Sequence, residues 1–79
     1  MRLRGLVDIL AFLNLLDKHN IVYRIDHRRP DSIMISYTHV GVRVELDFFY
    51  NHIEYSLFKG DESVLDDQDI IFRLIAEHV

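Results

Sequence analysis

The 79-residue chain has no cysteine, no tryptophan, one proline and three glycines. The absence of cysteine excludes a disulfide framework and thiolate metal sites, and it is consistent with a reducing compartment. No apolar run reaches the roughly 20 residues that a membrane span requires. The longest candidate, residues 6–16, is interrupted by Asp8 and Asn14. We therefore expect a cytoplasmic protein with no membrane partner.

Positive charge is also scarce. Nine lysines and arginines stand against 13 acidic residues, which gives a formal net charge of −4 at pH 7. A protein that binds the phosphate backbone should carry a lysine- and arginine-rich face, so no nucleic-acid partner is expected. The one basic run, residues 27–29, precedes Pro30 and is interpreted as a solvated surface turn.

Residues 32–59 set the expected fold. Apolar side chains recur there at every second position, which is the period of half-buried strands and not of a helix. A two-residue loop at 51–52 and a four-residue loop at 38–41 would both place the same apolar set on one face of an antiparallel meander. The pairs next to these two turns would be Tyr50 with Ile53 and Tyr37 with Val42. The inward set is Ile33, Ile35, Tyr37, Val42, Val44, Leu46, Phe48, Tyr50, Ile53, Tyr55 and Leu57.

Two amphipathic segments flank these strands. Residues 5–19 are predicted to form a helix that ends with Asn20 in a left-handed conformation, and residues 21–26 are predicted to form the first strand. A second helix is predicted at residues 67–78, with Asp66 as its N-cap. The inward side chains are Leu6, Ile9, Leu10, Phe12, Leu13 and Leu16 in the first helix, and Ile21, Tyr23 and Ile25 in the strand.

The order of elements is therefore helix, four strands, helix, in a single α+β domain spanning residues 1–79. A sheet with one apolar face and two amphipathic helices can bury all three only if both helices cover that face. We predict a two-layer sandwich in which an antiparallel four-stranded meander carries both helices on one face. The other sheet face would remain open to solvent.

That open face is the predicted site of function. It mixes aromatic, sulfur-containing and charged side chains, a composition found at protein interfaces. The alternative is that these aromatic residues have no binding role. Isolated aromatic residues are common on protein surfaces, and strands favour phenylalanine at any position. The predicted partner-binding residues are Met34, Arg43, Glu45, Asp47, Phe49, Glu54 and Phe58.

Self-association is a separate prediction. Val7 and Leu15 fall outside the apolar stripe of the first helix, and Phe49 and Phe58 are expected to point outward. These side chains would form a homodimer contact. The alternative for Val7 and Leu15 is a wide stripe on a deeply packed helix.

Two further groups could carry chemistry. The acidic residues of the stretch 61–69 supply enough carboxylates for a hard cation, although they lack the EF-hand spacing. A pair of histidines, His19 and His39, could join Asp61 or Glu62 in a metal site or an acid–base dyad. No motif spacing supports either, and neither a nucleophile elbow nor a phosphate-binding glycine loop is present. We expect no catalytic activity and no cofactor.

The order of elements resembles the frataxin-like arrangement, and size and acidity resemble small immunity or antitoxin proteins. The frataxin resemblance covers topology alone, because this chain has fewer strands, no tryptophan in its sheet, and its densest acids before the second helix. It implies metal binding by the stretch 61–69. The immunity resemblance implies a non-catalytic interaction module that binds a partner, including a basic one, through the open sheet face. We take the second as the leading hypothesis.

Overall fold

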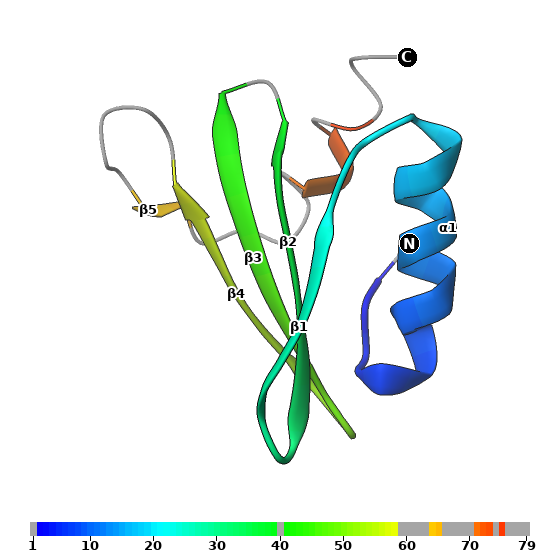
Figure 1. The fold of residues 1–79 in the computed structure, drawn as a ribbon, viewed down its shortest axis with the longest axis vertical. Coiled ribbons are helices and arrows are strands. Elements are labelled where there is room, and N and C mark those ends of the chain that lie inside the picture. The colour runs from blue at the N-terminus through cyan, green and yellow to red at the C-terminus, as the bar shows by residue number, and fades with distance from the viewer. Residues whose placement is uncertain (1, 40, 59–63, 66–70, 74, 76–79) are drawn as a thin grey trace.

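A computed structural model describes residues 2–39, 41–58, 64, 65, 71–73 and 75 of the chain. A 3-10 turn η1 (Leu6–Asp8) leads into helix α1 (Ile9–Lys18), which is followed by strands β1 (Arg24–Arg29), β2 (Ser32–His39), β3 (Val42–Phe49), β4 (Ile53–Phe58) and β5 (Val64–Leu65). Residues 71–73 and 75 are helical. The strands form one antiparallel sheet in the order β1-β2-β3-β4-β5 (Figure 1).

The core lies between one face of this sheet and the helical segments. Phe12 of α1 is fully buried, and its ring centroid lies 5.9 Å from that of Phe48 on β3 and 6.1 Å from that of Tyr37 on β2. Ile71 and Ile75 from the C-terminal helical residues belong to the same core. Both helical segments therefore cover the same face, and the predicted two-layer α+β sandwich is confirmed (Figure 1).

The period-two pattern works as predicted in the central strand. Along β3, Val42, Val44 and Leu46 are buried, whereas Arg43 between them is exposed. Each fully buried apolar side chain contributes about 1.5–3 kcal/mol relative to an exposed one. Burial of alternate side chains thus fixes which face of the strand meets the helices.

Both hairpins have a register two residues away from the predicted one. In the β2–β3 hairpin His39 pairs with Val42, so the connection has two residues instead of four. Gly41 in this connection has a φ of 73°, a left-handed conformation that glycine adopts readily. Because side chains alternate with a period of two, a slip of two residues leaves the side chains within the paired strands on their predicted faces.

In the β3–β4 hairpin Phe48 pairs with Ile53, so the connection comprises residues 49–52. The backbone N–H of Phe49 donates a 2.9 Å hydrogen bond to the carbonyl of His52 and closes this turn. The prediction that Tyr50 points inward is wrong. Tyr50 is 87% exposed, because it lies in the turn beyond the last pair of the ladder.

Strand β1 begins later than predicted. It covers Arg24–Arg29, so the basic run 27–29 lies in a strand, and the turn to β2 contains only Pro30 and Asp31. The predicted inward residue Ile25 does face the core side, where it pairs with the buried Ile35. It is nevertheless 55% exposed, because β1 is an edge strand with a neighbouring strand on one side only.

Three further features differ from the predictions or lie beyond them. Leu10 is 70% exposed instead of inward, because it lies on the solvent side of α1. A fifth strand, β5, pairs with the end of β4 where a connection was expected. The predicted N-cap Asp66 and most of the predicted second helix lie outside the described residues.

No helix within the described ranges is long and apolar enough to cross a membrane.

The end of α1 follows the sequence closely. Asn20 has a φ of 56°, as predicted for the left-handed stop. The N–H of Ile21 donates to the carbonyl of Leu16 at 2.9 Å, and the N–H of Asn20 donates to that of Asp17 at 3.1 Å. These two bonds form a Schellman motif, which satisfies two of the last helix carbonyls and directs the chain toward β1.

The N-terminal segment packs tightly against the β3–β4 turn at Gly5. A Cβ atom on Gly5 would lie 2.7 Å from the carbonyl oxygens of both Phe49 and Tyr50, and the glycine has a φ of 155°. The atoms that this Cβ would meet all belong to the backbone, so no flexible side chain could move to make room. Only glycine fits at this position without a shift of the segment.

We predict that Gly5→Ala lowers the free energy of unfolding by about 1–3 kcal/mol, because it adds a steric clash to an unfavourable backbone conformation. Gly41→Ala is the matched control. Gly41 also has a positive φ, but nothing lies within 4 Å of its Cβ position. The control should lose only about 1 kcal/mol. Urea unfolding of both variants measures the difference, and equal losses would contradict the tight packing.

A second N-terminal contact joins Arg4 to Asp8. The backbone N–H and Nε of Arg4 donate to Oδ2 of Asp8 at 2.8 and 3.0 Å, and Nη2 donates to Oδ1 at 2.9 Å. The hydrogen bonds from the Arg4 side chain, then those from its backbone, lower the pKa of Asp8 from 3.8 to about 2. This pair fixes the segment that enters η1.

A lowered carboxyl pKa stabilises the folded state above the unfolded-state pKa, and the contribution is lost as pH falls through the folded-state pKa. Asp8→Asn should therefore lower the urea midpoint at pH 6, and the difference from the wild type should shrink as pH falls from about 4 to about 2. Asp31→Asn, at an exposed turn acid, is the control and should leave the midpoint unchanged at pH 6. A difference for Asp8→Asn that is independent of pH would contradict the prediction.

Candidate functional site: the outer sheet face

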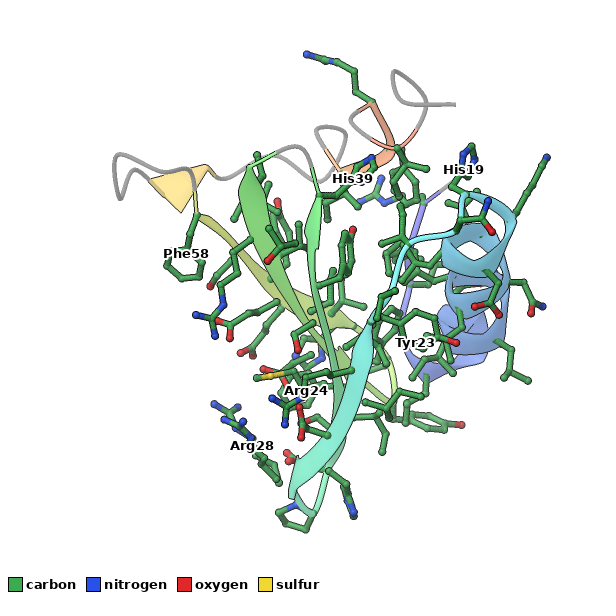
Figure 2. All side chains as sticks on the ribbon, turned by 45° about the horizontal axis from the view of Figure 1, so that its top comes forward. His19, Tyr23, Arg24, Arg28, His39 and Phe58 are labelled. Carbon is green, nitrogen blue, oxygen red and sulfur yellow. The ribbon has the colours of Figure 1, made fainter. Side chains whose placement is uncertain are left out.

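The sheet face opposite the helices is called here the outer face. Figure 2 shows Phe58 on this side, pointing away from α1, whereas Tyr23 points toward α1. All seven predicted partner-binding residues lie at outer-face positions of β2, β3 and β4. The outer face comprises Ser32, Met34, Ser36, Thr38, Arg43, Glu45, Asp47, Phe49, Glu54, Ser56 and Phe58.

Strand register places three of the predicted residues in one row across the sheet. Met34 on β2 pairs with Asp47 on β3, which in turn pairs with Glu54 on β4. A hollow of about 250 Å³ lies over this row, and we call it the acidic hollow. Its lining residues are Arg29, Met34, Glu45, Asp47, Glu54, Tyr55 and Ser56. The structure thus brings together four of the seven predicted residues around one hollow.

Arg29 is a member of this site that the sequence interpretation missed. It was assigned to a turn, but it lies in β1 and pairs with Ser32. A bulge between Asp26 and Arg29 shifts the β1–β2 register, which turns Arg29 toward the outer face. The basic run itself was visible in the sequence, and only its assignment to a strand would have revealed this role.

Several outer-face charges are paired with neighbours. Arg43 Nη2 lies 3.1 Å from Glu45 Oε2, and His52 Nε2 lies 3.4 Å from Glu54 Oε2. These are exposed or half-exposed pairs, which contribute little to stability. Asp47 has no ion pair within the described part of the chain. Its Oδ1 lies 3.5 Å from the hydroxyl of Ser32, which is a weak contact.

The acidic hollow therefore contains an electrostatic conflict. Asp47 and Glu54 are directly opposed across β3 and β4, and like charges at opposed positions destabilise a sheet. Glu45 adds a third carboxylate to the same lining. Arg29 is the only cationic side chain in that lining. Three carboxylates outnumber one arginine, so the acidic hollow can accept a further positively charged group.

Phe49 lies at an outer-face position, as predicted, but it is buried by its neighbours. Its ring stacks on the His52 ring at 4.5 Å between centroids, and the guanidinium carbon of Arg29 lies 5.9 Å from its centroid. Phe49 is only 7% exposed, so the prediction of an exposed contact aromatic is wrong. It instead anchors the β3–β4 turn and the Arg29 side chain. Phe58 is half-buried and remains on the outer face.

Within the described residues the histidines form no metal-binding group, and the acidic side chains of the stretch 61–69 lie outside those residues. His19 and His39 lie at the same end of the molecule (Figure 2). Their proposed partners Asp61 and Glu62 lie outside the described residues. Across the ranges that the structure does describe, no group of three or more histidine or acidic side chains could hold a metal ion.

No protein-family model matches the chain, and neither a curated protein nor a solved structure is significantly similar to it.

The charge conflict generates a prediction about stability. Glu54→Lys replaces a like-charge pair with an opposite-charge pair facing Asp47, so the free energy of unfolding should rise by about 0.2–1 kcal/mol. Asp31→Lys makes the same change in net charge at an exposed turn residue that does not line the hollow, and it should have a smaller effect. Urea unfolding at low salt compares the two variants. A loss of stability in Glu54→Lys relative to Asp31→Lys would contradict the conflict.

Proposed function

We propose that this chain is a non-catalytic protein-interaction module, of immunity, antitoxin or adaptor type, that binds a basic partner through its outer face. The observation that carries the proposal is the opposed pair Asp47 and Glu54, which lies beside Met34 in the acidic hollow. A lysine or arginine of the partner would enter this hollow. Its positive charge would relieve the repulsion between the two carboxylates.

The cost of this arrangement to the fold supports the proposal. A sequence that specifies one structure avoids local conflicts, and real proteins break such rules mainly at functional sites. The position of Glu54 would tolerate a neutral or basic residue without loss of any buried contact, since its side chain is exposed. Retention of a carboxylate opposite Asp47 is therefore better explained by binding than by folding.

The remaining outer-face residues fit a contact of this kind. Met34 supplies a flexible, polarizable apolar surface at the hollow, which adapts to different partner shapes. Glu45 also lines the hollow, and it can exchange its ion pair with Arg43 for partner contacts. The net charge of −4 steers a basic partner during encounter, so association should weaken with rising salt.

The alternative function is frataxin-like metal binding by the acidic stretch 61–69. Of this stretch, only Val64 and Leu65 lie within the described residues, and they form β5. No contact or distance in the described residues favours this alternative. The proposal accordingly rests on the outer face.

Site-specific photo-crosslinking in the native cell tests the proposal. A photoreactive aromatic residue replaces Phe58 or the exposed Thr38 on the outer face, and a matched control replaces the exposed Leu10 on α1. We expect a discrete protein adduct from both outer-face positions and none from position 10. Adding Glu54→Lys should abolish the adduct, whereas Asp31→Lys should leave it intact. An adduct that forms only from position 10, or that persists in Glu54→Lys, would contradict the proposal.

A further inference from the structure

The edge of the sheet carries a second surface with its own chemistry, which we call the β1 edge (Arg24–Arg29). Within the described residues β1 is the first strand of the sheet and pairs only with β2. All of its residues except Asp26 are exposed. An edge strand presents unpaired backbone N–H and C=O groups, which can pair with another extended chain.

The two faces of the β1 edge differ. Ile25 lies on the core side, where it is 55% exposed. Arg24 and Arg28 project on the side away from α1 (Figure 2), and Arg29 lines the outer-face hollow. Three arginines and one histidine occur among the six residues, against the single acid Asp26. The edge is therefore basic, with Ile25 as its one apolar residue, in a chain whose net charge is −4.

This charge selects between possible occupants. Arginines on an edge prevent pairing between copies of the same chain. If the β1 edges of two copies paired antiparallel about the midpoint of the strand, Arg24 of one copy would lie opposite Arg29 of the other. Like charges at opposed positions are unfavourable. The same arginines would attract an acidic strand. A partner of opposite charge thus fits where a second copy does not.

We propose that the β1 edge binds an extended acidic segment of a partner by strand addition. Backbone hydrogen bonds would supply affinity, and alternate side chains of the added strand would supply specificity. On one side of that strand, apolar residues cover Ile25. On the other side, carboxylates meet Arg24 and Arg28. This surface is distinct from the acidic hollow, and the inference does not depend on the proposed function.

Titration of the isotope-labelled full chain with a capped octapeptide of alternating valine and glutamate tests the inference. We expect saturable amide shifts centred on residues 24–29 and slower hydrogen exchange of β1 amides. A lysine-for-glutamate peptide should not bind. A glutamate peptide that is N-methylated at alternate residues should also fail, because it keeps the charge but lacks the donors for strand pairing.

Variants separate the edge from general charge effects. Arg28→Glu should weaken binding of the glutamate peptide about five-fold, and Arg28→Gln less. The control Arg73→Glu, at an exposed helical position, should leave the affinity unchanged. Glu54→Lys should not weaken peptide binding, although it should abolish the outer-face adduct, so the two proposals fail independently.

Four results would overturn the inference. The first is that the glutamate peptide does not bind, and the second is that the N-methylated peptide binds as tightly as the unmodified one. The third is that Arg28→Glu and Arg73→Glu change the affinity equally. The fourth is that the β1 amide signals shift with protein concentration in the absence of peptide. The last result would assign the edge to a second copy of this chain.

Discussion

Burial of one sheet face beneath α1 is the constraint on which the rest of this structure depends. Phe12 reaches from the helix between Tyr37 and Phe48, and its ring also meets Phe72 edge-on at 6.2 Å between centroids. A chain of 79 residues must bury nearly all of its apolar side chains in one core, so both helical segments pack on that face. Within the described residues, both helical segments pack on the core side of the sheet, and β1 pairs with one neighbouring strand only.

The outer face and the β1 edge differ in charge and meet at Arg29. This side chain belongs to the basic edge strand, yet it lies over the Phe49 ring and lines the acidic hollow. Phe49 and His52 hold the adjacent turn in place by stacking, and Gly5 packs against the same turn from the N-terminal segment. Arg29 thus connects the lining of the hollow to the turn against which the N-terminal segment packs. A partner on the outer face would therefore meet a pre-formed surface.

Stability and the proposed binding make opposite demands on the outer face. Ion pairs such as Arg43 with Glu45 satisfy charges locally, whereas Asp47 and Glu54 repel each other across the sheet. A small sandwich of modest stability retains such a repulsion at some cost. The position of this conflict, beside Met34 in a hollow, distinguishes the outer face from an ordinary solvated surface.

The sequence by itself determined which side chains share a face. A period of two is a property of the extended backbone, so the inward and outward sets within the paired strands were correct although both hairpin registers were two residues away from the predicted ones. The helix stop at Asn20 was equally local, because it depends on consecutive residues. Only the tertiary structure decided the turn lengths, the burial of Phe49 and the exposure of Ile25, Leu10 and Tyr50. Periodicity gives the direction of a side chain, but whether another element covers it depends on contacts between residues far apart in the chain.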